Sequence, residues 1–105
     1  MSESGIPSTD INGVPEVIPA DLVVLDVREP HEWAAGHIDG AIHIPLRELP
    51  NRVGELDPSA RALVVCHVGG RSAQATAWLH AQGHDVVNLE GGMDAWERAG
   101  RPIAG

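Results

Sequence analysis

The hydrophobic pattern predicts four short strands that alternate with helices. The strand signals are apolar runs, and they extend over residues 22–27, 41–44, 62–66 and 86–89. In the first and third runs apolar residues follow one another without alternation, as in strands that a parallel sheet buries on both faces. Helical patterns fill the gaps over residues 30–35, 50–56, 72–82 and about 93–99, with Pro at two of the starts and Gly after three of the ends.

Strands that alternate with helices build right-handed βαβ units. We therefore expect an α/β fold, a three-layer domain with a central, mainly parallel sheet flanked by helices. Residues 1–13 are rich in Ser, Gly and Asp, and we expect them to be flexible or to add an edge strand. Residues 14–105 then form a single domain, since a chain of 105 residues has no room for a second one.

Charge and composition exclude several classes of function. The net charge is −8, and all seven basic residues are arginines, so no lysine can form a Schiff base. The negative charge and the lack of Phe and Tyr argue against a nucleic-acid partner. The acidic start does not resemble a signal peptide, and no apolar run approaches the ~18 residues of a membrane span. We expect a cytoplasmic protein with no membrane partner.

The segment with the strongest chemical signal follows the third strand. It contains the chain's one cysteine, a Gly-containing loop and a helix start: Cys66, His67, Val68, Gly69, Gly70, Arg71 and Ser72. Ligands bind at the carboxyl ends of strands in open parallel sheets. Successive backbone amides of such a loop, together with a helix N-terminus, can stabilise an anion and lower the pKa of a thiol.

A lone cysteine is more often a buried, inert residue than a nucleophile. Here, however, two glycines, an arginine five positions on and a helix start follow Cys66. A cysteine that only fills the core needs none of these features. We therefore interpret Cys66 as a catalytic nucleophile and the loop 67–72 as its substrate-binding environment.

The chain resembles the rhodanese-like family of sulfurtransferases over about residues 22–103. Three blocks agree in order: DVRE (26–29) with Glu32 and GHIDGAIHIP (36–45), then CHVGGRS (66–72), then GGMDAW (91–96). The resemblance is to the single-domain members. It implies a persulfide on Cys66 and a double displacement, in which a sulfane sulfur moves from a donor such as thiosulfate to a thiol or cyanide. A sulfur-carrying protein is a further candidate partner, and the reaction requires no metal or organic cofactor.

Two alternatives remain. Some rhodanese-like domains lack the cysteine and act as partner-binding modules. Cysteine phosphatases and arsenate reductases of the same fold use a loop one residue longer, with arginine six positions after the cysteine, where this chain has Ser72. Arg71 also stands where the family's thiosulfate and mercaptopyruvate enzymes usually have Thr, and His67 and Val68 differ as well, so the donor stays open.

Other polar residues receive weaker assignments. Asp26 and Arg28 end the first strand and either border the site or tie the loop between strand and helix. His67 either lines the pocket or faces solvent. We assign turn and surface positions, with no metal, to His31, His37 and His43, and core positions to the tryptophans Trp33, Trp78 and Trp96.

Overall fold

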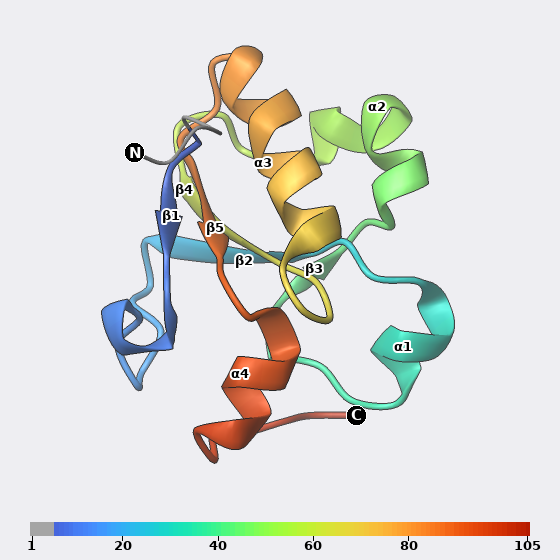
Figure 1. Cartoon of the computed structure of the whole chain (residues 1–105). Coiled ribbons are helices and arrows are strands. Elements are labelled where there is room, and N and C mark those ends of the chain that lie inside the picture. Colours follow the sequence, from blue (N-terminus) through green and yellow to red (C-terminus); the bar gives the residue numbers. More distant parts are fainter. Residues whose placement is uncertain (1–5) are drawn as a thin grey trace.

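The computed structural model describes residues 6–105. Five parallel strands form one sheet in the order β1-β5-β4-β2-β3, which confirms the expected α/β fold (Figure 1). Their bounds are Ser8–Thr9 (β1), Leu22–Asp26 (β2), Ile42–His43 (β3), Arg61–Val65 (β4) and Val86–Leu89 (β5). The two outer strands, β1 and β3, are two residues long.

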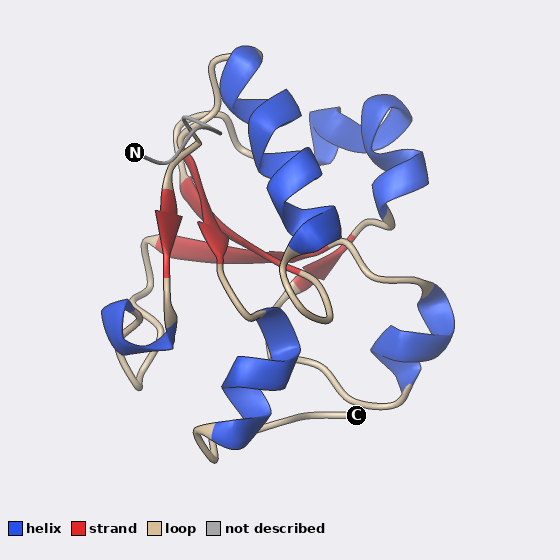
Figure 2. Cartoon of the chain, in the orientation of Figure 1, coloured by secondary structure: helices blue, strands red, loops and turns tan. Residues whose placement is uncertain are grey.

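Helices cover both faces of this sheet, as Figure 2 shows. The α-helices are Pro30–Ala34 (α1), Leu49–Arg52 (α2), Gly70–Ala81 (α3) and Gly92–Arg98 (α4), and the 3₁₀ turns are Ile11–Gly13 (η1), Leu46–Glu48 (η2) and Val53–Glu55 (η3). Helices α2 and α3 pack on one face, and α4 packs on the other. The result is the three-layer arrangement that the sequence predicts.

Alternate residues of the central strands supply two separate cores. In β2, Leu25 joins the core under α2 and α3, whereas Val24 joins the core under α4. In β4, Val64 and Val65 divide in the same way. Because each face is covered, both sets must be apolar, which explains the unbroken hydrophobic runs.

Several local predictions need correction. The helix expected over 50–56 is a shorter helix, α2, flanked by the 3₁₀ turns η2 and η3. Trp33 belongs to neither core: it stacks on His37 at 3.6 Å and on His43 at 4.7 Å between ring centroids. Both histidines are half-buried rather than at the surface, whereas His31 is exposed. Trp96 is buried in the core under α4, and Trp78 packs against the core under α3.

The N-terminal segment was expected to be flexible or to form an edge strand. Within it, Ser8–Thr9 forms the edge strand β1, paired in parallel with β5. The part of the prediction that covers residues 1–5 lies outside the described residues. In the described part of the chain, no helix is both long enough and apolar enough to span a bilayer.

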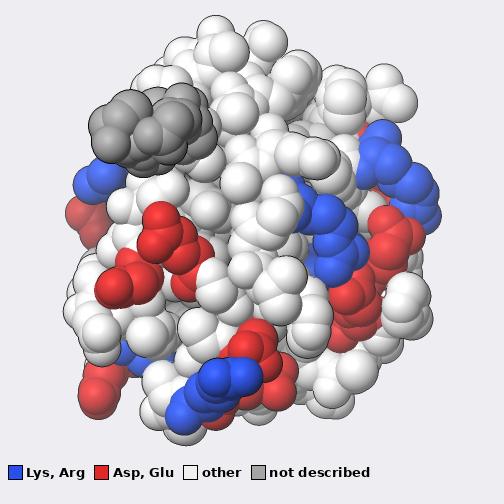
Figure 3. All heavy atoms as spheres, viewed as in Figure 1, with Lys and Arg blue, Asp and Glu red and all other residues white. Residues whose placement is uncertain are grey.

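Arginine side chains lie beside acidic ones on the surface. On the face shown in Figure 3, each blue patch adjoins a red one. Two of the protein's ion pairs join residues one helical turn apart, Arg52 with Glu48 at 2.8 Å and Arg98 with Asp94 at 3.1 Å. Exposed pairs of this kind contribute little to stability, but they leave few cationic groups free for an anionic ligand.

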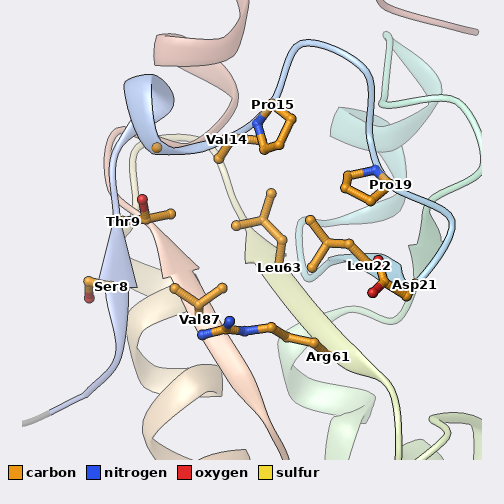
Figure 4. Close-up of a pocket in the computed structure, with 11 residues that line it drawn as sticks. Ser8, Thr9, Val14, Pro15, Pro19, Asp21, Leu22, Arg61, Leu63 and Val87 are labelled. Carbon is orange, nitrogen blue, oxygen red and sulfur yellow. The ribbon is translucent and has the colours of Figure 1, made fainter.

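A cavity of about 400 Å³ lies between the N-terminal segment and the sheet (Figure 4). Pro15 and Pro19 lie on one side of it, and Leu63 and Val87 of the sheet lie on the other. Its lining includes the first residue of β4, Arg61. The cavity is therefore at the opposite end of the strands from Cys66.

Candidate active site

Cys66 directly follows β4, a central strand of the sheet, and its exposed fraction is 1%. The loop then turns at Gly69, whose φ of +111° favours glycine, and α3 begins at Gly70. A Cβ at position 69 would also come within 3.3 Å of the amide nitrogen of Gly91. Backbone conformation thus requires glycine at the point where the chain bends around the sulfur.

The loop supplies hydrogen-bond donors to the sulfur. The amide of Gly69 donates to Sγ of Cys66 at 3.0 Å. Ser72, in the first turn of α3, is fully buried, and its hydroxyl donates to the carbonyl of Gly69 at 3.1 Å. The hydroxyl therefore lies at the inner wall of the loop, where it can also turn towards the sulfur.

Burial is the largest single influence on the pKa of the Cys66 thiol, and it raises that pKa. Polar groups of the loop act against burial: the hydroxyl and amide of Ser72 and the amides of Gly69 and Arg71 favour the charged sulfur. Together they outweigh it, so the pKa of Cys66 lies below its ordinary value. Since only the thiolate is nucleophilic, this environment favours the reactive form.

The first turn of α4 holds the base of the loop. The amide of Met93 donates to the carbonyl of Cys66 at 2.7 Å, and the amide of Asp94 donates to the carbonyl of His67 at 2.9 Å. These bonds engage the carbonyls of the two residues that begin the loop. The Gly69 amide, later in the loop, donates to the sulfur.

Arg71 forms a bidentate ion pair with Glu32 of α1. Its two terminal nitrogens donate to the two carboxylate oxygens at 2.7 and 2.9 Å. The carboxylate also accepts the backbone N–H of Glu29 at 2.9 Å. Chiefly because of the Arg71 hydrogen bond, the pKa of Glu32 falls to about 2. The sequence predicted that Arg71 belongs to the substrate-binding environment of Cys66, and it predicted no contact between Arg71 and Glu32.

Asp26 and Arg28 form a buried pair at the end of β2. The Arg28 guanidinium donates to both Asp26 carboxylate oxygens at distances of 2.8 to 3.1 Å. One of its nitrogens also donates to the carbonyl of Gly36 at 2.8 Å, just beyond α1. The pair thus ties the end of β2 to the segment after α1.

The remaining loop side chains point outwards. His67 is exposed, so of its two predicted positions the structure shows the solvent-facing one. The exposed fraction of Val68 is 60%, and Gly70 is exposed as well. His67, Val68 and Gly70 therefore form the outer surface of the site, while Cys66 and Ser72 lie inside. Among the described residues, no group of three His, Cys, Asp or Glu side chains could hold a metal ion.

A model of the rhodanese-like domain matches residues 16–99 of this chain. A sulfurtransferase of Allochromatium vinosum is 40% identical over 84 residues, 79% of this chain and 78% of the relative. The thiosulfate sulfurtransferase GlpE of Pseudomonas putida is 41% identical over 75 residues, 70% of this chain and 68% of the relative. The putative sulfur carrier protein YrkF of Bacillus subtilis is 36% identical over 96 residues, 89% of this chain and 52% of its own length.

Among solved structures, the rhodanese-related protein of Thermoplasma volcanium superposes with a TM-score of 0.88 and 36% identity, covering 93% of this chain and 97% of that one. The match extends over nearly all of both chains, so the similarity concerns the whole fold and not the loop alone. Together with its relatives named sulfurtransferases, these matches show that the chain belongs to the rhodanese-like domain family.

Proposed function

We propose that this protein is a sulfurtransferase that carries a sulfane sulfur as a persulfide on Cys66. The observation that supports the proposal most is the environment of one atom. Sγ of Cys66 is at the carboxyl end of β4, accepts the Gly69 amide, and has a lowered pKa despite its burial. A structural cysteine has no need for these donors, whereas an attacking thiolate does.

In the first half-reaction the Cys66 thiolate attacks the outer sulfur of the donor. With thiosulfate, the new bond joins Sγ to the sulfane sulfur, and the sulfur–sulfur bond of the donor breaks. The thiolate and thiosulfate together carry three negative charges. Sulfite leaves with the electron pair of the broken bond and with two of these charges, and the persulfide anion keeps the third. The amides around Sγ stabilise negative charge on the persulfide as they do on the thiolate.

In the second half-reaction a nucleophile attacks the outer sulfur of the persulfide. Cyanide takes that sulfur as thiocyanate, and a thiolate takes it as a new persulfide, and in both cases the thiolate of Cys66 is restored. This chain has no second cysteine to displace the sulfur internally. The persulfide therefore waits for an external acceptor.

The acceptor can also be a protein that carries sulfur. The similarity to the putative sulfur carrier protein YrkF supports this proposal. So do the exposed positions of His67 and Val68, since a partner can contact them without entering the site. We keep the cytoplasm as the proposed compartment, because a reducing environment supplies thiols as acceptors.

The test is intact-mass spectrometry after incubation with a sulfane-sulfur donor. The wild type should gain the mass of one sulfur atom, and cyanide should remove it. Cys66→Ser should gain nothing, although its thermal unfolding should remain cooperative. Sulfur transfer by the folded Cys66→Ser variant would contradict the proposal. A wild type that gains no sulfur would favour a partner-binding role for the domain.

A further inference from the structure

We infer that Glu32 determines the class of sulfur donor at this site, favouring persulfides of the form R–S–SH over thiosulfate. The inference rests on the proposed function, because it concerns which donor delivers sulfur to Cys66. It starts from the ion pair between Glu32 and Arg71. Arg71 is the cation of the active loop, and its charge is close enough to interact with the Cys66 thiolate.

Glu32 occupies both terminal nitrogens of Arg71. The donor–acceptor distances of 2.7 and 2.9 Å are those of a bidentate pair. The exposed fraction of the side chain is 34% for Arg71 and 23% for Glu32. The carboxylate is held from a second side by the N–H of Glu29. With a pKa of about 2, Glu32 stays ionised throughout the neutral range. The pair is therefore part of the resting site at working pH.

The other arginines close to α1 are also engaged. Arg28 is buried on Asp26, and Arg47 lies on Glu29 at 3.1 Å. In the part of the chain that the structure describes, every arginine near the end of β2 is therefore paired with a carboxylate. An incoming anion meets no free guanidinium there. The backbone amides of the loop are the donors that remain.

This arrangement disfavours thiosulfate more than a persulfide. Thiosulfate is a dianion and must approach the Glu32 carboxylate, or displace it from Arg71, before its sulfite leaving group gains a cationic partner. A persulfide R–S–SH is attacked at its outer sulfur: a bond forms from Sγ to that sulfur, the sulfur–sulfur bond of the donor breaks, and its electron pair leaves with the thiolate RS⁻. The proton stays on the transferred sulfur, now part of the Cys66 persulfide, and the leaving thiolate carries a single charge. The loop amides can stabilise that smaller charge without a free guanidinium.

The experiment compares kcat/KM for thiosulfate with kcat/KM for cysteine persulfide, using persulfide formation on Cys66 as the readout. In the wild type we expect cysteine persulfide to be the better donor by at least about tenfold. Glu32→Gln removes the charge and releases Arg71, so the ratio of thiosulfate to persulfide kcat/KM should rise about tenfold, mainly through a lower KM for thiosulfate.

Glu55→Gln is the matched control. It removes the same charge elsewhere on the surface, and the ion-pair partner of Glu55 is Arg52, so Arg71 stays bound to Glu32. The donor ratio should stay within about twofold of the wild type. The double variant Glu32→Gln/Arg71→Gln should lose the gain in thiosulfate use, because the released guanidinium is absent.

Several outcomes would overturn the inference: a wild type that prefers thiosulfate, an unchanged ratio in Glu32→Gln, or an equal rise in Glu55→Gln. An equal loss with both donors in Glu32→Gln would show that the residue only supports the loop. Where Glu32→Gln does not fold, Glu32→Asp shortens the side chain and should raise the ratio about threefold. An unchanged ratio in that variant also contradicts the inference. If neither donor modifies wild-type Cys66, the proposed function itself is overturned.

Discussion

Gly92 lies so close to the backbone of Cys66 that a Cβ at position 92 would come 2.3 Å from the Cys66 carbonyl oxygen. The same oxygen accepts the N–H of Met93 at 2.7 Å. Gly92 also has a φ of +53°, which places it in the left-handed region. Close approach and backbone angle together require glycine at the start of α4, and both conditions fix the base of the active loop.

Gly92→Ala should therefore destabilise the protein by roughly 3 kcal/mol or more, since the methyl group meets backbone on one side and the φ is unfavourable. Urea unfolding followed by tryptophan fluorescence measures the loss. Gly54→Ala is the matched control, because a Cβ at position 54 would meet no atom within 4 Å. Similar stabilities for the two variants would show that α4 can move away from the loop.

Loss of the buried pair at the end of β2 should be costly. Arg28→Ala leaves the Asp26 carboxylate buried without its partner, and we expect a loss of about 3–5 kcal/mol in the free energy of unfolding. Arg98→Ala removes an exposed arginine that also pairs with an aspartate, and its cost should stay below about 0.5 kcal/mol. Chemical denaturation of both variants gives the comparison, and a small loss in Arg28→Ala would contradict the structural role of the pair.

Ser72→Ala should shift the pH dependence of persulfide formation to higher pH. The Ser72 hydroxyl favours the Cys66 thiolate, so its removal raises the pKa of the thiol and reduces the reactive fraction at neutral pH. At high pH the rate should recover. Thr76→Val is the control, because Thr76 lies one turn further along α3 and its buried hydroxyl has no partner among the described residues. Equal shifts in both variants would point to helix packing instead.

The Glu32–Arg71 pair should make stability sensitive to acid. The pKa of Glu32 falls from an ordinary 4.5 to about 2 on folding. Because the folded value is the lower one, the stabilisation is complete above about pH 4.5 and is lost as the pH falls through about 2. The free energy of unfolding should fall more steeply in this window for the wild type than for Glu32→Gln. Parallel curves would show that the pair contributes nothing.

Local signals in the sequence predicted most of the framework. The strands β2, β4 and β5 coincide with apolar runs because the parallel sheet is buried on both faces. The glycines of the loop and the cysteine before them also predicted the turn at Gly69, since φ there excludes most other residues. In each case neighbouring residues in the chain carry the information.

Such local signals could not predict contacts between residues far apart in the sequence. Glu32 and Arg71 are 39 residues apart, and nothing local to either residue indicates that they pair. The stack of Trp33 with His37 and His43 arises because α1 and β3 meet beyond the edge of β2, so a hydrophobic residue becomes half-buried outside the core. One clue was available: the first sequence block contains a helix-start carboxylate, and the loop contains an arginine in need of a partner.

The short outer strands affect how the molecule behaves beside other proteins. β1 and β3 are two residues each, so neither border of the sheet offers a long row of backbone groups to a foreign strand. The net charge of −8 adds mutual repulsion between copies. A unit built in this way can be joined to a second domain through a linker without recruiting that domain's strands, and it should resist aggregation at high concentration.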